Sequence, residues 1–373
     1  MIRPLWIELD LGALSKNLKH IRNHVGDGVE LLATIKQSAY GHGLIPIARE
    51  LAEQGVTFFG VGSIEEAITL REDGFKGSIL VLSAVLDKFV TYFVQNDITP
   101  AVVDIEFAKK LSQEAKKASK IMPIHIKVDT GMGRLGPHYK QAGNFIRRVN
   151  NLSNLYLEGI YTHFPVADND PEFTNKQINA FGGLIKELKK EKITFKYRHC
   201  ANSIGLINYP DAHFNMVRPG IVLYGIKPSD NISLDVTPVL SLKSRIIFIK
   251  KIEKGMSVSY GRCFIADKAR NIATVSVGYA DGYPWSLSGV SKVIIGSKLF
   301  DIAGRVCMDH IMVDLKDNKD IKVKEEVILI GRRGKAKISV EELAKLAKTI
   351  PYEIVSRLSY KIPRFYKGLS DKR

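Results

Sequence analysis

Several residues with chemically useful groups directly follow short β-type runs, at positions where a strand would end. They are Lys36, Lys127, Arg134, His163, His199, Asn202, Ser203, Arg218, Gly220 and Ile221. Backbone N–H groups near Ser203 and Gly220 suit a phosphate, and clustered cations favour the same anion. A lysine whose pKa is lowered by such neighbours can form a Schiff base with an aldehyde. The pattern predicts a site for a phosphorylated aldehyde cofactor such as pyridoxal phosphate.

Each of these residues also has an ordinary interpretation. A lysine at a strand end is most often a solvated cation, so Lys36 alone indicates little. His163 and His199 could be structural histidines. Chemistry is favoured because so many polar groups come at strand ends, which meet on one side of a barrel. No cluster with the spacing of metal ligands competes with this interpretation.

The elements that must position these residues alternate between strand and helix patterns from residue 31 to 218. Eight parallel strands with crossovers close into a barrel, whereas the competing open sheet lacks a GxGxxG string after its first run. We therefore predict a (β/α)8 TIM-type barrel over residues 13–230. Amphipathic stretches expected to be helical include 44–54, 63–73 and 104–118. The β-type runs end near Lys36, Val61, Leu82, Val103, Val128, Tyr161, Cys200 and Arg218.

The pattern changes after residue 230. Short runs rich in Val and Ile, separated by glycine-containing turns, continue to the C-terminus. One helix is expected after the N-cap Ser339, ending before Pro351. Residues 231–373 are therefore predicted to form a mainly β domain. Residues 1–12 contain a strand that could pair with either domain, and we assign it to the second.

Length and composition exclude several classes of protein. A chain of 373 residues with 45% hydrophobic and 25% charged residues is neither a small module nor a disordered protein. No apolar run reaches the roughly 18 residues of a transmembrane helix, and the N-terminus lacks a secretory core. Three widely spaced cysteines favour a reducing compartment. We expect a cytoplasmic protein with no membrane partner.

The formal net charge of +16 raises nucleic acid as a possible partner. Most of the excess lies after residue 230, and its densest cluster is GRRGKAK at 331–337. No RNP pattern or zinc-finger spacing accompanies these cations, so we expect no nucleic-acid partner.

Nine strings spread over the chain together resemble the alanine racemase family. In order they are IKQSAYGHG, KVDTGMGRLG, YTHF, HCANS, VRPGIVLYG, VSYG, VGYADGYP, GRVCMD and YEIVSRLSYKIPRFY. The resemblance implies an enzyme that interconverts L- and D-alanine on pyridoxal phosphate and supplies D-alanine for peptidoglycan. It also implies a head-to-tail homodimer whose active sites combine residues of both subunits.

The resemblance further implies two catalytic bases. Lys36 would hold the cofactor and act as one base, and Tyr260 from the VSYG string of the partner subunit would be the other. A racemase needs a base on each face of a planar carbanion, and this pair meets that need without a metal. The remaining cofactor-binding residues would be Tyr40, His163, His199, Asn202, Ser203, Arg218, Gly220, Ile221 and Tyr352.

Arg218 would face the pyridine nitrogen of the cofactor, with His199 orienting it and His163 stacking on the ring. Because arginine keeps its proton, the ring nitrogen would stay neutral, which disfavours transamination. Arg134 would lie near the substrate carboxylate, together with the backbone of Met308 and the ring of Tyr279 from the partner subunit.

Lys127 would place a second cation beside Arg134. The family's answer is a carbamylated lysine whose carboxylate pairs with the arginine, although Asp129 or solvent could serve instead. Departures from the family pattern are Gln37 and Ser38 after Lys36, Trp285 in place of Arg, and His310 in place of Gln. They bear on the surroundings of the lysine and on substrate range. The alternatives are a racemase that also takes serine or lysine, a non-catalytic protein that binds pyridoxal phosphate, and a basic binding module.

Overall fold

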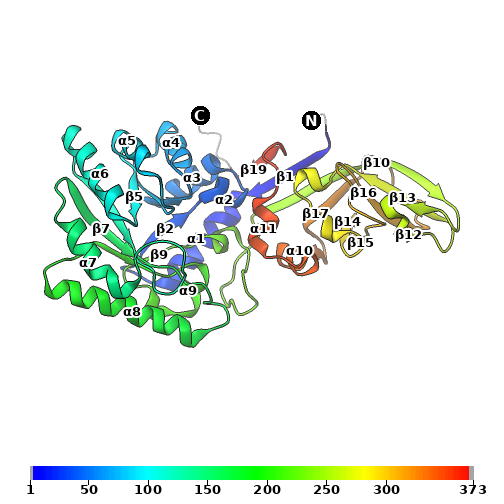
Figure 1. The fold of residues 1–373 in the computed structure, drawn as a ribbon. Coiled ribbons are helices and arrows are strands. Elements are labelled where there is room, and N and C mark those ends of the chain that lie inside the picture. Colours follow the sequence, from blue (N-terminus) through cyan, green and yellow to red (C-terminus); the bar gives the residue numbers. More distant parts are fainter. Residues whose placement is uncertain (1–2, 369–373) are drawn as a thin grey trace.

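The computed structural model describes residues 3–368, which fold as a barrel followed by a mainly β domain (Figure 1). The barrel sheet runs in the order β8-β7-β6-β5-β4-β3-β2-β9, and all neighbouring strands are parallel. The predicted (β/α)8 barrel with a mainly β second domain is therefore confirmed. The barrel strands are β2 (Glu30–Thr34), β3 (Phe58–Val61), β4 (Ser78–Val81), β5 (Thr99–Val102), β6 (Met122–Lys127), β7 (Leu155–Tyr161), β8 (Tyr197–His199) and β9 (Met216–Val217).

The two end strands, β8 and β9, meet and nearly close the barrel. The N–H of Arg218 donates to the carbonyl oxygen of Ala201 (3.0 Å), and Asn215 Oδ1 accepts from the N–H of Arg198 (2.8 Å). Each of the eight predicted strand ends falls at the end of an observed strand or just past it. All eight carboxyl ends therefore point to the same mouth.

Helices alternate with the barrel strands and cover the outside of the sheet (Figure 1). Their starts follow from local capping, because Ser63 accepts from the N–H of Glu66 and Asp104 from that of Phe107. Within residues 3–368, every helix is too short or too polar to cross a membrane. The barrel helices are α1 (Leu11–Val25), α2 (Lys36–Tyr40), α3 (Leu44–Glu53), α4 (Ile64–Glu72), α5 (Val90–Gln95), α6 (Ile105–Lys117), α7 (Tyr139–Asn150), α8 (Pro171–Lys190) and α9 (Ser203–Asn208).

The second domain is built on one sheet with the main order β15-β14-β17-β10-β1-β19. The N-terminal strand β1 (Leu5–Asp10) lies inside it, antiparallel to β10 and parallel to β19. Strand β1 therefore belongs to the second domain, and α1 leads from it into the barrel. The other strands are β10 (Leu240–Ile252), β11 (Ser257–Val258), β12 (Phe264–Ile265), β13 (Arg270–Val275), β14 (Lys292–Ile295), β15 (Lys298–Asp301), β16 (Ile311–Lys316), β17 (Glu326–Arg333), β18 (Ala336–Ile338) and β19 (Arg364–Lys367).

Two short helices, α10 (Val340–Ala347) and α11 (Pro351–Ser356), lie on the barrel side of the second domain (Figure 1). The side chain of Ser339 caps α10 by accepting from the N–H of Glu342 (3.1 Å). The helix ends before Pro351, as predicted, and its last residue is Ala347 because Lys348 adopts a left-handed conformation (φ 55°). Ile350 is extended, as a residue before proline tends to be.

Candidate active site

A cavity of about 330 Å³ opens at the carboxyl ends of the barrel strands. Ten of the residues predicted to form the site line it: Lys36, Tyr40, Lys127, Arg134, His163, Asn202, Ser203, Arg218, Gly220 and Tyr352. The structure therefore gathers these residues from five strand ends and from the second domain around one space. Its lining within residues 3–368 contains lysine and arginine but no aspartate or glutamate, so the cavity suits an anionic ligand.

Lys36 stands at the start of an unusual backbone turn. The next four residues, Gln37 to Tyr40, all have φ between 52° and 54°, which is the left-handed region. Non-glycine residues lose about 1–2 kcal/mol each there, so contacts from outside the turn must stabilise it. The carboxylate of Glu66 does so by accepting from the N–H of Ser38 (2.8 Å) and, through its other oxygen, from that of Gly62 (2.9 Å). The departures Gln37 and Ser38 thus lie in this turn.

The second domain also holds the turn in place. Arg364 Nε donates to the carbonyl oxygen of Gly41 (2.9 Å), and Tyr366 donates its hydroxyl proton to that of His42 (3.0 Å). Gly41 packs directly on α11, since a Cβ there would lie 2.3 Å from the carbonyl oxygen of Val355. The position of Lys36 therefore depends on both domains.

We expect Gly41→Ala to lower the free energy of unfolding by about 3 kcal/mol. The added methyl group would have to displace the Val355 carbonyl and would also sit at φ +80°. Gly26→Ala is the matched control, because Gly26 has φ +77° with nothing within 4 Å of its Cβ position, and it should cost about 1 kcal/mol. Urea denaturation measures both. Equal losses in the two variants would show that the close contact with Val355 contributes nothing.

The Lys36 amine is embedded among cations. Burial, followed by the charge of Arg134, lowers its pKa below the ordinary lysine value, and the charge of Glu66 offsets part of this. A lowered pKa leaves more of the neutral amine near neutral pH, and the neutral amine is the form that attacks an aldehyde and accepts a proton.

Lys127 is buried more deeply, with its Nζ 4.5 Å from the centre of the Tyr161 ring. Burial, then Arg218 and Arg134, lowers its pKa well below the ordinary value, which favours the neutral form of the amine. The nearby carboxylate of Asp129 instead accepts from the N–H groups of residues 131, 132 and 133 at 2.8–3.1 Å. Asp129 is therefore committed to shaping its own loop.

Arg218 is buried, and its two terminal nitrogens make five polar contacts. Nη1 donates to Nδ1 and to the carbonyl oxygen of His199, both at 2.9 Å. Nη2 donates to the carbonyl oxygens of Thr162 (2.8 Å) and Cys200 (3.0 Å) and lies 3.4 Å from His163 Nδ1. Burial lowers the pKa of Arg218 to about 10, which still leaves it protonated at neutral pH. The guanidinium is thus held in one orientation.

The contacts of Arg218 also set the tautomer of His199. Because arginine only donates, His199 Nδ1 must accept, and its Nε2 then donates to His125 Nδ1 (2.8 Å). His125 Nε2 in turn faces Glu158 Oε2 at 3.5 Å. Burial lowers the pKa of His199 well below the ordinary value, so the ring is neutral at pH 7.

Sequence reasoning missed His125, Glu158 and the ring of Tyr161, which stacks on His199 at 4.9 Å. One signal was present, because His125 and Lys127 are two residues apart on a strand and therefore point to the same side. Gly159 leaves room for this arrangement, since a Cβ there would lie 2.4 Å from the His125 ring. The partly exposed His163 has a pKa lowered well below the ordinary value, first by desolvation of its ring and then by Lys127.

A cradle for a phosphate lies between Tyr40, Ser203 and Gly220. The N–H of Gly220 donates to Ser203 Oγ (3.0 Å), and a Cβ on Gly220 would lie 2.7 Å from the Tyr40 hydroxyl. Asn202 caps α9 by accepting from the N–H of Gly205 (2.9 Å). Ile221 is fully buried and begins the 3-10 turn η3 (Ile221–Tyr224), with its side chain outside the cavity lining. This cradle and the surrounding cations fit a phosphorylated aldehyde.

Besides His199 and Ile221, which are buried next to lining residues, three predicted site residues do not reach this cavity within one chain. Tyr260, Tyr279 and Met308 lie in the second domain with 69%, 44% and 54% of their surfaces exposed. Tyr279 and Met308 are neighbours, because the N–H of Tyr279 donates to the Cys307 carbonyl (3.0 Å) and that of Ala280 to the Met308 carbonyl (3.0 Å). Tyr279 and Met308 therefore form an exposed pair that is separate from the barrel cavity.

Comparison with known proteins assigns the chain to a family. The family model "Alanine racemase, N-terminal domain" matches residues 9–228, and "Alanine racemase, C-terminal domain" matches residues 239–366. An alanine racemase of Halothermothrix orenii is 41% identical over 98% of this chain and 97% of its own length. The chain belongs to the alanine racemase family.

Solved structures of alanine racemases share the whole fold. The Clostridium difficile enzyme in complex with cycloserine is 35% identical, with a TM-score of 0.90 over 97% of this chain and 95% of its own. The Bacillus anthracis enzyme with bound L-Ala-P is 34% identical, with a TM-score of 0.91 over 98% and 95% of the two chains.

Two departures from the alanine racemase pattern lie beside the exposed group of the second domain. The guanidinium carbon of Arg305 lies over the Trp285 ring, 5.5 Å from the centre of that ring. Trp285 and Tyr279 both line a separate cavity of about 670 Å³. The carbonyl oxygen of His310 accepts from the N–H of Cys307 (2.9 Å), which closes the loop that carries Met308.

Proposed function

We propose that this chain is an alanine racemase that interconverts L- and D-alanine with pyridoxal phosphate, supplying D-alanine for peptidoglycan. The observation that carries the proposal is the placement of Lys36, whose amine lines a cavity rich in cations and has a lowered pKa, in a chain of this family. The names of the relatives do not favour a racemase with a broader range over one for alanine.

The cavity residues have distinct roles in this proposal. When bound, pyridoxal phosphate supplies an aldehyde that condenses with amines and a ring that withdraws electrons from the α-carbon. Lys36 would hold this aldehyde, and Arg218 would donate a hydrogen bond to the ring nitrogen without releasing its proton. His199 fixes Arg218, and His163 would lie against the ring. The phosphate would be held by Tyr40, Asn202, Ser203, Gly220, Ile221 and Tyr352.

Proton transfer needs a base on each face of the α-carbon. Lys36 Nζ removes or returns the proton on one face, and the hydroxyl of Tyr260 from a partner subunit serves the other. The exposure of Tyr260, Tyr279 and Met308 supports a homodimer, because these side chains lie outside the lining of their own barrel cavity. Tyr279 and the backbone of Met308 contact the substrate carboxylate.

Arg134 binds the substrate carboxylate from the barrel side. We propose that Lys127 is carbamylated and pairs with it, since its amine has a strongly lowered pKa and Asp129 is occupied by backbone N–H groups. In this step the neutral amine nitrogen bonds to the carbon of carbon dioxide and loses one proton to solvent, which leaves a carbamate anion near Arg134 and the buried Arg218.

Following alanine in deuterated water tests the proposed function. Purified protein loaded with pyridoxal phosphate should exchange the α-hydrogen of L-alanine and produce D-alanine, whereas L-serine should react more slowly and L-lysine not at all. Proton NMR follows exchange, and chiral chromatography follows inversion. Absence of inversion with alanine would refute the proposal, and equal rates with all three amino acids would refute its substrate range.

A further inference from the structure

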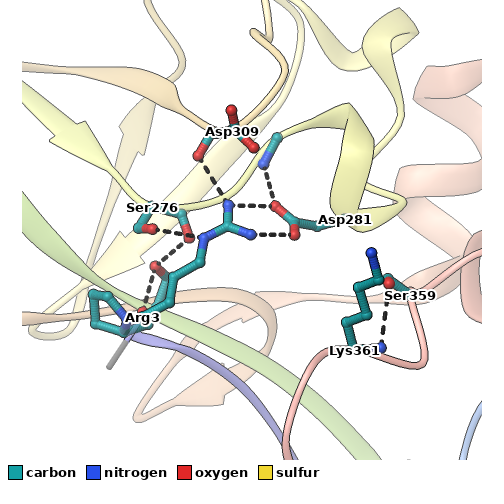
Figure 2. A network of polar contacts seen from close by, with 9 residues as sticks. Arg3, Ser276, Asp281, Asp309, Ser359 and Lys361 are labelled. Carbon is teal, nitrogen blue, oxygen red and sulfur yellow. Dashed lines mark hydrogen bonds and ion pairs between the residues drawn. The ribbon is translucent and has the colours of Figure 1, made fainter. Parts of the chain in front are cut away.

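Arg3 makes a network of four polar contacts inside the second domain (Figure 2). Both terminal nitrogens of its guanidinium donate to the Asp281 carboxylate, Nη1 to Oδ1 (2.5 Å) and Nη2 to Oδ2 (2.7 Å). Nε donates to Ser276 Oγ (3.2 Å), and Nη2 also donates to the carbonyl oxygen of Asp309 (3.1 Å). Only a planar fork can make this set of contacts at once, so a lysine could not replace it fully.

The network joins two segments that carry proposed substrate contacts. Asp281 ends the 3-10 turn η5 (Tyr279–Asp281), and Asp309 directly follows Met308. The segments are closely packed, since a Cβ on Gly278 would lie 2.1 Å from the Met308 carbonyl oxygen, and backbone hydrogen bonds already join them. The Arg3 side chain adds a further bridge, between the Asp281 carboxylate and the Asp309 carbonyl oxygen.

Arg3 also supplies the charge that balances Asp281. The Asp281 side chain is only 8% exposed, and Arg3 is its one ion-pair partner among residues 3–368. Its other contact is the N–H of Gly278, which donates to Oδ2 (2.9 Å). Without Arg3, a buried negative charge would remain two residues from Tyr279, where it would repel the carboxylate of an amino-acid substrate.

The sheet does not need this side chain for its own integrity. Strand β1 begins at Leu5 and is paired on both sides, with β10 and β19. Arg3 precedes it, and its side chain is 42% exposed at the edge of the network. Its guanidinium reaches away from the strand to the two substrate segments (Figure 2).

We propose that Arg3 is a positioning residue for the substrate carboxylate. It holds Tyr279 and Met308 at the spacing that binding requires and neutralises Asp281. The inference rests on the proposed function, in which these two residues serve the active site of the partner subunit. Arg3 therefore acts on the site whose Lys36 belongs to the other chain.

Kinetics of the full-length holoenzyme test the positioning role. Arg3→Gln should raise KM for alanine by about 10-fold or more while kcat changes by less than about 3-fold, because it weakens binding of the carboxylate. The visible absorbance of the bound cofactor should be unchanged. Arg3→Lys keeps the charge but not the planar fork, so its KM should lie between that of the unmodified enzyme and that of Arg3→Gln. Adding Asp281→Asn to Arg3→Gln removes the unpaired charge and should also lower KM.

Arg245→Gln is the matched control in the same domain. The Arg245 side chain lies over the ring of Trp6 and donates to the Lys324 carbonyl (2.8 Å), so it takes no part in the Arg3 network, and its loss should leave both constants unchanged. A KM for Arg3→Gln equal to that of the unmodified enzyme would overturn the inference. So would a loss confined to kcat or to cofactor binding.

Mixed dimers separate this inference from the proposed function. Lys36→Ala and Tyr260→Phe subunits, when paired, should form one intact site if sites are shared. Arg3→Gln paired with Lys36→Ala should likewise regain a site with the normal KM, whereas Arg3→Gln paired with Tyr260→Phe should not. Failure of the first pair refutes the shared site of the proposed function. If the first pair is active but the pair of Arg3→Gln with Lys36→Ala lacks a site with the normal KM, only the role of Arg3 is refuted.

Discussion

Lys36→Ala should abolish racemisation, lowering kcat by at least about 10⁴-fold, and should remove the visible absorbance of a cofactor Schiff base. The amine has two roles in the proposal, as the group that holds the aldehyde and as the base on one face. Removing it leaves the phosphate cradle, so pyridoxal phosphate should still bind, but reversibly. Turnover assays and absorbance spectra before and after gel filtration measure these effects.

Lys140→Ala is the control for this prediction. Lys140 lies exposed on α7, away from the cavity lining, and its loss should change neither turnover nor the spectrum. Survival of more than a trace of activity in Lys36→Ala, with the variant folded and able to bind the cofactor reversibly, would contradict the role of Lys36.

Tyr260→Phe should lower racemisation by about 10³-fold while leaving the cofactor spectrum intact. The phenyl ring preserves the shape of the residue, and only the hydroxyl that carries the proton is lost. Because Lys36 remains, exchange of the α-hydrogen in deuterated water should persist for one enantiomer of alanine and nearly vanish for the other. Proton NMR of each enantiomer distinguishes the two faces.

Tyr360→Phe removes a hydroxyl from another tyrosine of the second domain, one that is 85% exposed and outside the proposed site. It should behave as the unmodified enzyme does. Full activity in Tyr260→Phe, or an equal loss of exchange from both enantiomers, would show that the second base is another group.

The sequence by itself determined the architecture and most of the cavity. Strand ends such as Val61 and Tyr161, and helix starts capped by Ser63 and Asp104, depend on patterns of a few residues. These patterns are readable because alternation, helical periodicity and capping act between residues close in the chain. Parallel connectivity then brings the strand ends to one mouth, so the polar residues that follow them converge.

Other features of the site became visible only in the folded chain. No local pattern predicts four successive left-handed residues after Lys36, because that conformation is unfavourable for Gln37 and Ser38 taken alone. It persists because Glu66, from another βα unit, and Arg364, from the second domain, bind its backbone. The hydrogen bonds that fix Arg218 through His199 and His125 likewise join strands far apart in the sequence.

Site residues whose role depends on their own chemical group and their neighbours in the chain could thus be predicted from the sequence. Residues whose role depends on partners distant in the chain could not. Lys36 and Arg218 carry groups whose chemistry is visible at a strand end. Arg3 acquires a role only because Asp281 and Asp309, nearly three hundred residues later in the chain, meet around its guanidinium. Such contacts arise from loop closure and packing over the whole chain, and only the tertiary structure decides which of them form.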